Sequence, residues 1–127
     1  MNTFEAAELL PRIPLTRYRI VERVSSEHAS MTATVRLMPE NVVWDVVFSS
    51  LVGYRVFDER DFLSYWPACS QGTVFEVLKG GWLDTPGFEA DVLLSGFYGV
   101  VREFFVAGED QCVSVLATEE PSIAQCN

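Results

Sequence analysis

The amino-acid sequence predicts a mainly β protein of the α+β class, a curved antiparallel sheet of about six or seven strands with one or two short helices. Two observations support this prediction. Several segments between residues 18 and 57 alternate apolar and polar residues with a period of two, as strands with one buried face do. Two later segments, 97–107 and 112–118, are apolar at nearly every position, as strands covered on both faces are.

The length and composition indicate one folded domain spanning residues 1–127. Hydrophobic residues make up 49% of the chain and charged residues 21%, which is the composition of a folded rather than a disordered chain. Nine basic against 18 acidic residues give a net charge of −9. This excess disfavours binding to nucleic acid or to anionic membranes and favours a basic protein partner.

The first expected element is a short helix at 3–10 (TFEAAELL), with Thr3 as N-cap and Pro11 after its end. Strands are then expected at 18–24, 31–37, 42–48 and 52–57. In 18–24, Tyr18, Ile20 and Val24 share one side, opposite Arg17, Arg19 and Arg23. In the other three strands, the residues that share one side are Met31, Ala33, Val35 and Leu37 in 31–37; Val42, Trp44, Val46 and Phe48 in 42–48; and Val52, Tyr54 and Val56 in 52–57.

The periodicity changes at Asp58. Segment 58–66 (DERDFLSYW) has acids where a helix begins and is followed by Pro67, so we expect a helix there. Segment 74–79 predicts another strand, and 83–91 predicts a loop because proline and glycine interrupt it.

The two apolar segments 97–107 and 112–118 predict a central hairpin. The four residues between them fit a tight connection. Glu109 and Asp110 are therefore expected to be exposed turn residues, and Phe104 and Phe105 to be core residues.

The residues that could carry chemistry are few. His28 is the single histidine, in a polar turn where we expect it to be exposed, and this count excludes multi-histidine metal sites. The odd number of cysteines favours reduced thiols. We expect Cys112 to be a core residue, Cys69 to be the most exposed thiol and Cys126 to be mobile. No catalytic residue, cofactor or metal site is predicted, because no acidic cluster or glycine pattern has the spacing of a known site.

An aromatic residue with neighbouring acids is the best candidate for a binding surface. Trp82 follows two glycines and is expected to be partly exposed, with an acidic rim formed by Asp84, Glu89 and Asp91. The acids Asp58, Glu59 and Asp61 could form the rim instead, and the sequence does not choose between the two sets.

The segments GGWL (80–83) and REFFVAGEDQCVSVLATEEP (102–121) resemble small acidic bacterial proteins akin to the immunity proteins of polymorphic toxin systems. The resemblance covers the C-terminal third of the chain. It implies a non-catalytic binding protein whose partner is a basic toxin domain, blocked by acids that mimic its substrate's charge.

A second interpretation is a half-barrel that binds a small molecule or acts as an enzyme, with an aromatic pocket. Tyr54, Trp66 and Tyr98 would line the pocket, and Asp58 or Glu103 would supply its polar group. A buried Arg102–Glu103 step would favour this interpretation, because interior charge needs a partner or a purpose; a bulge that turns both residues outward is the alternative. A third interpretation is a subunit that forms homodimers through an apolar sheet face.

The sequence also favours a cytoplasmic protein. The first residues, MNTFEAAELLPRIPL, carry two acids before their first base and no apolar run of signal-peptide length. No segment approaches the roughly 20 apolar residues that span a bilayer.

Overall fold

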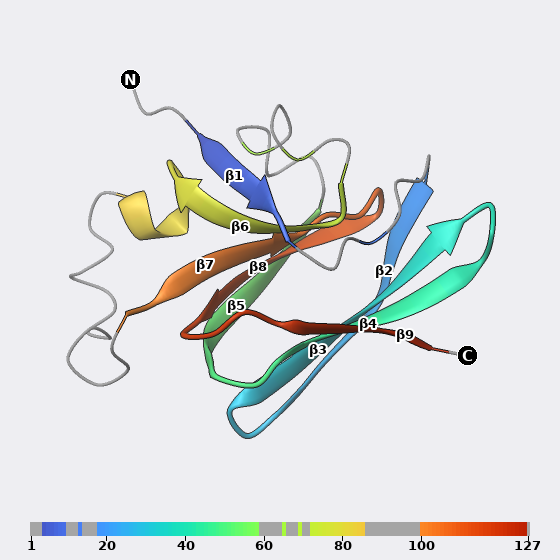
Figure 1. Ribbon diagram of the computed structural model, residues 1–127, viewed down its shortest axis with the longest axis horizontal. Helices are drawn as coiled ribbons and strands as arrows, with labels where there is room; N and C mark the ends of the chain where they lie inside the picture. The colour runs from blue at the N-terminus through green and yellow to red at the C-terminus, as the bar shows by residue number, and fades with distance from the viewer. Residues whose placement is uncertain are drawn as a thin grey trace.

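The computed structural model describes residues 4–9, 13, 18–58, 65, 69, 72–85 and 100–126. Within these ranges, nine strands form two antiparallel sheets, which we call sheet A and sheet B (Figure 1). The predicted mainly β, antiparallel class is therefore confirmed. The strands are divided between two sheets rather than joined in one.

Sheet A has five strands and sheet B has four. In spatial order, sheet A consists of β1 (Glu5–Glu8), β6 (Val74–Lys79), β7 (Arg102–Val106), β8 (Gln111–Ala117) and β5 (Leu51–Asp58). In spatial order, sheet B consists of β2 (Tyr18–Glu27), β3 (Ser30–Met38), β4 (Val42–Phe48) and β9 (Ser122–Cys126).

Besides the passage from β1 to β2, the chain crosses between the sheets at two adjacent places. It passes from β4 to β5 through Ser49 and Ser50, and from β8 to β9 through residues 118–121. The backbone N–H of Thr118 donates a hydrogen bond to the carbonyl oxygen of Ser50 (3.1 Å). The two crossovers therefore lie side by side, and the sheets are tied together there.

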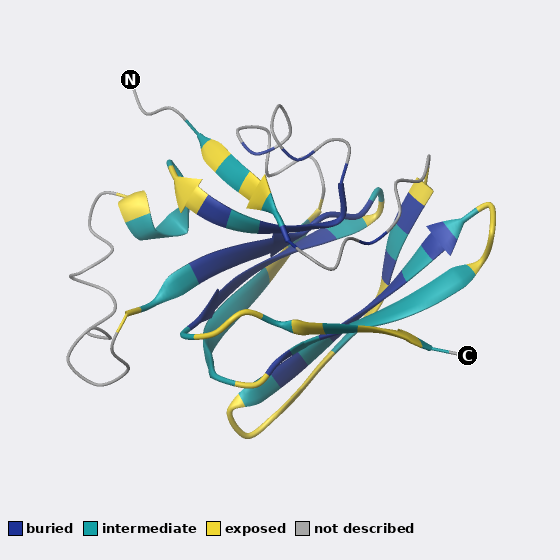
Figure 2. Cartoon of the chain, viewed as in Figure 1, coloured by how far each residue is buried: buried dark blue, intermediate teal, exposed yellow. Residues whose placement is uncertain are grey.

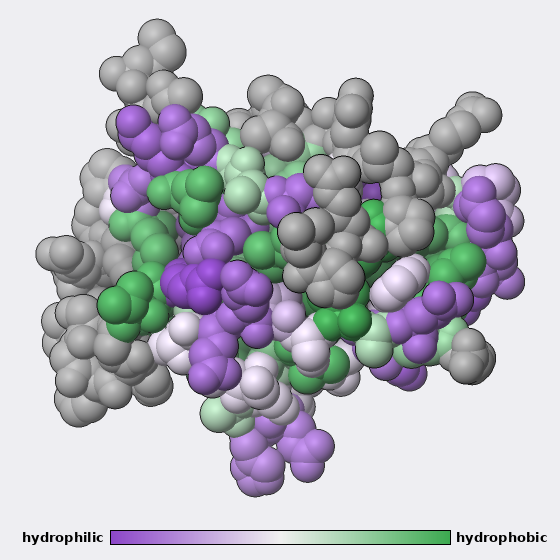
Figure 3. Space-filling model, viewed as in Figure 1, coloured by the Kyte–Doolittle hydropathy of each residue, from purple (hydrophilic) through white to green (hydrophobic). Residues whose placement is uncertain are grey.

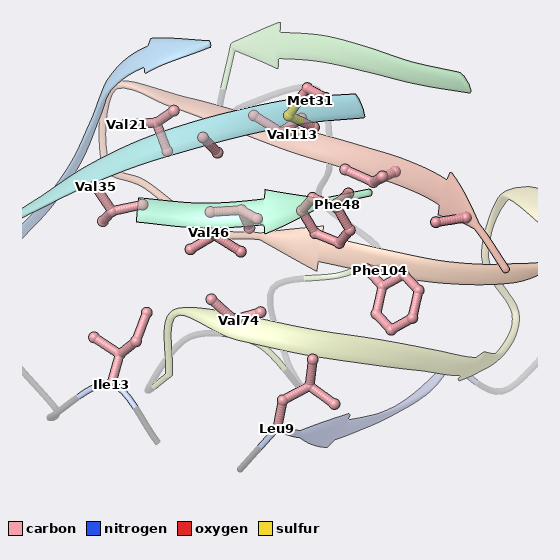
Figure 4. Close-up of a cluster of buried hydrophobic side chains, with 14 of the residues drawn as sticks. Leu9, Ile13, Val21, Met31, Val35, Val46, Phe48, Val74, Phe104 and Val113 are labelled. Carbon is pink, nitrogen blue, oxygen red and sulfur yellow. The ribbon is translucent and has the colours of Figure 1, made fainter. Parts of the chain in front are cut away.

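The core between the two sheets is formed by residues from both (Figure 4). In β3, Met31, Ala33, Val35 and Leu37 are all buried, as their alternation predicts. Sheet A contributes a matching set from its inner face: Val74, Phe104, Val106, Val113, Val115 and Ala117. We call this cluster the inter-sheet core.

Strand β2 differs from its predicted orientation. Arg19 and Val21 are buried, whereas Tyr18 is 47% exposed. The register with β3 skips one residue between Val21 and Arg23. This bulge places Val21 and Val24 on the same side, a spacing that simple alternation does not predict.

The predicted helix at 3–10 is wrong, because residues 5–8 form strand β1, which pairs with β6. Helical composition is a weak preference, and hydrogen bonding to a sheet edge outweighs it here. The predicted helix at 58–66 lies outside the described residues, except for Asp58 at the end of β5 and Tyr65.

Sheet A is also buried on its outer face, the face turned away from sheet B. Phe75, Val77, Phe105 and Cys112 form a second cluster there with Tyr65 and Cys69. Dark blue segments follow one another along β6, β7 and β8 in Figure 2, because both faces of these strands are covered. The prediction of doubly covered strands at the end of the chain is confirmed for β7 and β8.

The predicted hairpin joins β7 to β8, with β7 beginning at Arg102; residues 97–99 lie outside the described ranges. Strand β9 was not predicted. Its segment, SIAQC, has a single β-branched residue and therefore a low intrinsic preference for a strand. Pairing with β4 stabilises the strand instead.

Candidate functional site

The short turn that carries Trp82 is held by its own residues. We call residues 80–85 the Trp82 turn; it contains the 3₁₀ helix η2 (Trp82–Asp84). Gly80 has a φ of 81°, a conformation that favours glycine. The Asp84 carboxylate accepts a hydrogen bond from the N–H of Gly80 (2.7 Å), and the Thr85 N–H donates to the Trp82 carbonyl (3.1 Å). The turn is thus closed locally.

A buried glutamate holds this turn on the outer face of sheet A. One carboxylate oxygen of Glu103, Oε1, accepts hydrogen bonds from the backbone N–H groups of Trp82 (2.6 Å) and Leu83 (3.3 Å). The other oxygen accepts from the hydroxyls of Tyr65 (2.5 Å) and Ser114 (3.3 Å). We call these residues the Glu103 cluster. Glu103 is 1% exposed, so its carboxylate depends on these donors in place of water.

Gly81 is required for this close approach. A Cβ atom built on Gly81 would lie 2.5 Å from Oε1 of Glu103 and 2.7 Å from a methyl group of Val77. The backbone of the Trp82 turn can therefore reach the carboxylate because residue 81 has no side chain.

The electrostatics of the Glu103 cluster follow from its burial. Burial raises the pKa of Glu103, and the hydrogen bonds from Tyr65, Leu83 and Trp82, together with the charge of Arg55, oppose the rise. Burial and the neighbouring Glu103 also raise the pKa of Tyr65. The cluster therefore favours a neutral Tyr65 and takes up a proton at Glu103 more readily than an exposed carboxyl does.

One face of the Trp82 indole is covered by Arg55. The guanidinium carbon of Arg55 lies 4.2 Å from the Trp82 ring centre and 5.2 Å from the ring centre of Phe57. A cation over an aromatic face is attracted by the ring electrons. Trp82 is partly exposed, as predicted, and its orientation is fixed by both its backbone and its ring.

The candidate rim residues are only partly brought together. Asp84 is exposed in the same turn as Trp82, whereas Glu89 and Asp91 lie outside the described residues. Asp58 is exposed at the end of β5, opposite Gln111; it is three residues beyond Arg55, about 10 Å along an extended strand. Glu59 and Asp61 also lie outside the described residues. Asp84 therefore lies in the Trp82 turn, whereas Asp58 lies at the end of strand β5.

The residues suggested for an aromatic pocket do not converge where they are described. Tyr54 packs against the inter-sheet core and donates its hydroxyl to Ser26 (3.2 Å), whereas Glu103 lies on the outer face of sheet A. Trp66 and Tyr98 lie outside the described residues. Arg102 and Glu103 point to opposite faces, since Arg102 pairs with Glu76 (2.8 Å) and Glu120 (3.1 Å).

A second buried charge was not predicted. The guanidinium of Arg19 pairs with Glu109 (2.9 Å) and donates to the carbonyl oxygens of Cys69 and Gly72. Burial alone would raise the pKa of Glu109, but Arg19 holds it below its usual value. Asp110 is exposed as expected, whereas Glu109 is a partly buried ion-pair partner. No local sequence signal marks this pair, because the two residues are 90 positions apart.

The predictions made for the cysteines and the histidine are confirmed in part. The predicted exposure of Cys69 is wrong: its side chain is buried, and burial beside Cys112 raises the pKa of Cys69 to about 12. Cys112 is a core residue as predicted. His28 is exposed in the β2–β3 turn as predicted, and Cys126 lies in β9. Within the described part of the chain, no three His, Cys, Asp or Glu residues are grouped as metal ligands would be.

The charges of the described residues are unevenly engaged. Four of the six described basic residues interact within the fold: Arg19, Arg36 and Arg102 form ion pairs and Arg55 stacks on Trp82. The acids that are exposed at the surface are Glu5, Glu22, Glu27, Glu40, Asp58, Asp84, Asp110, Glu119 and Glu120; of these, Glu22 and Glu120 pair with Arg36 and Arg102. The exposed basic residues of the described ranges are Arg23 and Lys79. The side chains available to a partner are therefore predominantly acidic.

Comparison with known proteins gives no relative. No protein-family model, no curated protein and no solved structure matches this chain. Across the described ranges, none of the helical segments has the length and apolarity needed to cross a membrane.

Proposed function

We propose that this protein is a non-catalytic binding module for a basic protein, with the Trp82 turn at the centre of its binding surface. The observation that carries the proposal is the way Glu103 holds, through the N–H groups of Trp82 and Leu83, the turn that carries Trp82 and Asp84. A surface that is rigid before binding loses little conformational freedom when it binds. Partly exposed aromatic residues beside charged ones are common anchors of protein interfaces.

The surface around the Trp82 turn suits such contact. Leu78 is 59% exposed and Val100 is 80% exposed, both close in sequence to the strand ends that flank the turn. In Figure 3, hydrophobic and hydrophilic surface alternate at the left, where the ends of β6 and β7 and η2 lie in Figure 1. Because the exposed charged side chains are predominantly acidic, a complementary partner surface would be basic.

The resemblance to immunity proteins gives this proposal its specific form. A basic toxin domain would be the partner, and the acids around the Trp82 turn would occupy its active site. The alternative function, a small-molecule site or enzyme, is supported by the buried Glu103 beside two hydroxyl groups. We favour the binding module because both oxygens of this carboxylate already accept hydrogen bonds from the protein.

The test is affinity capture from the source organism's lysate, followed by binding kinetics with the captured protein. Trp82→Ala should speed dissociation, because a central anchor is lost. Asp84→Asn keeps an oxygen that can accept from Gly80 but removes the charge, so it should mainly slow association at low salt. Glu40→Gln, an equal charge change in the β3–β4 turn, is the control. Unchanged kinetics in both turn variants would contradict the proposal.

A further inference from the structure

One strand edge lacks the protection that the other edges have. Within the described residues, β9 is the last strand of sheet B and pairs only with β4. Its sequence, SIAQC, contains no charged residue and no proline. A regular uncharged edge is a template for another strand, because its outward N–H and C=O groups have no strand partner.

The other three edges differ. The start of the β2 edge is occupied by the β7–β8 turn: the Arg19 N–H donates to the Glu109 carboxylate (2.8 Å), the Glu109 N–H donates to the Arg19 carbonyl (2.7 Å), and the Val21 N–H donates to the Asp110 carboxylate (3.0 Å). The edge strand β1 begins and ends with glutamate. The edge strand β5 carries Arg55 and Asp58 and has a bulge near its start. Charges and bulges of this kind discourage pairing with a further strand.

The surface beside β9 is hollowed at one end. A groove of about 470 Å³ is lined by Gln125 and Cys126 of β9, Val42 and Val43 of β4, and Arg36 and Asn41. Arg36, Val43 and Cys126 are cross-strand neighbours in sheet B. The groove therefore lies at the C-terminal end of β9 and has an arginine in its wall.

The two ends of β9 also differ in charge. Glu119 and Glu120 are exposed just before the strand begins; Glu120 pairs with Arg102, which it shares with Glu76, so acids remain in excess at this end. Near its C-terminal end, Arg23 and Arg36 balance Glu22 and Asp45. If two copies of β9 pair antiparallel, the acidic N-terminal end of each strand lies beside the C-terminal end of the other, where the charges are balanced and the groove is lined by Arg36. If they pair parallel, the two acidic N-terminal ends lie side by side and repel each other.

We propose that a second copy of this chain binds at the β9 edge, so that two β9 strands pair antiparallel and sheet B continues across the dimer. Centred on Ala124, the pairing sets Ser122 opposite Cys126 of the partner subunit. The small side chains Ser122, Ala124 and Cys126 then share one face across the junction, and Glu119 approaches the groove of the other copy. This surface is separate from the Trp82 turn, so its failure would leave the proposed function standing.

The small size of this contact determines the affinity that the experiment must be able to detect. A single pair of strands is smaller than a standard protein interface, so we expect a dissociation constant of about micromolar order. The net charge of each copy opposes association, but at about 0.15 M salt, charges more than about 8 Å apart are largely screened. Sedimentation of the full chain over a concentration series at this salt should show a reversible monomer–dimer equilibrium.

Two variants test the register. Ala124→Lys places two like charges opposite each other at the centre of the dimer and should weaken dimerisation about tenfold. Ala124 is exposed, so the fold tolerates the change, and circular dichroism checks this. Ser25→Lys adds the same charge at an exposed position of β2 and should leave the equilibrium unchanged.

A cross-link tests the alignment directly. Ser122→Cys should form disulfides between copies with Cys126 when oxidised glutathione is added as the oxidant, whereas Ser25→Cys should not. Cys69 and Cys112 are buried and do not compete. A chain that sediments as a monomer at every concentration, equal effects of Ala124→Lys and Ser25→Lys, or equal cross-linking of both cysteine variants would each overturn the proposal.

Discussion

The outer faces of the two sheets differ, although both sheets share one core. On sheet A, Phe75, Phe105 and Cys112 are buried on the face turned away from sheet B. On sheet B, the corresponding face carries Thr32, Arg36 and Val47, which are half-exposed. The difference shows what each kind of sequence pattern encodes: alternation gives a sheet with one buried face, and a continuous apolar run gives a sheet with two.

A second buried face brings polar groups into the interior. Glu103, on the outer face of sheet A, is nearly inaccessible to water and is surrounded by hydrogen-bond partners from several elements. The charged residues of sheet B are half-exposed or exposed, apart from Arg19 in β2, which is covered by the β7–β8 turn. The comparison therefore predicts that substitutions on the outer face of sheet A are more costly than matched substitutions on the outer face of sheet B.

The largest effect is expected for the aromatic residues of β7. Phe104 faces the inter-sheet core and Phe105 faces the outer cluster, and both are fully buried. Phe104→Ala and Phe105→Ala should each lower the free energy of unfolding by about 3–5 kcal/mol. Val47→Ala, on the outer face of sheet B, should lower it by less than about 1 kcal/mol. Urea denaturation measures all three; a small loss for Phe105→Ala would mean that the outer cluster is not a true core.

The next effect compares two ion pairs. The side chain of Arg19, in β2 of sheet B, is 5% exposed and its partner Glu109, in the β7–β8 turn, is 31% exposed, whereas Arg36 and Glu22, both within sheet B, are 30% and 38% exposed. Glu109→Gln leaves a buried guanidinium without its carboxylate and should cost about 2 kcal/mol. Glu22→Gln should cost less than about 1 kcal/mol. Equal losses in urea denaturation would show that burial does not set the strength of these pairs.

The smallest expected effect is a dependence of the free energy of unfolding on pH. The pKa of Glu103 is raised in the folded protein, so protonated Glu103 is favoured there relative to the unfolded chain. Its contribution to stability is present below the ordinary glutamate pKa and is lost as the pH rises through the folded value. The stability of the wild type relative to Glu103→Gln should therefore fall as the pH rises from about 4.5. Asp45→Asn, a matched change on sheet B, is the control; a rising difference for Glu103→Gln would contradict the assignment.

The sequence predicts where the strands lie better than it predicts which elements pair with them and cover them. Strand β3 and its buried residues follow from alternation alone, and β6 was predicted with its observed bounds. Strand β1 was not predicted, because its helical composition is overridden by a partner about 70 residues away. The bulge in β2 depends on pairing geometry that a single strand does not reveal.

The candidate site was predicted in part for a similar reason. Trp82 and Asp84 were found because glycines, an aromatic residue and an acid lie together in the sequence. Glu103 was recognised as unusual because it interrupts an apolar run, but its partners Tyr65 and Ser114 come from distant segments. The Arg19–Glu109 pair could not be predicted, since arginine in an alternating strand normally faces water.

This pair has a consequence for how the chain folds. Arg19 lies near the start of the chain and Glu109 near its end, and the turn that contains Glu109 also closes the edge of β2. During synthesis, β2 and β3 can pair early, but the guanidinium has no carboxylate from this turn until 90 further residues have been made. Contacts of such long sequence separation make folding slow, on the order of milliseconds to seconds for β proteins. Until the β7–β8 hairpin forms, the nascent chain exposes the start of the β2 edge, which the turn covers in the folded protein.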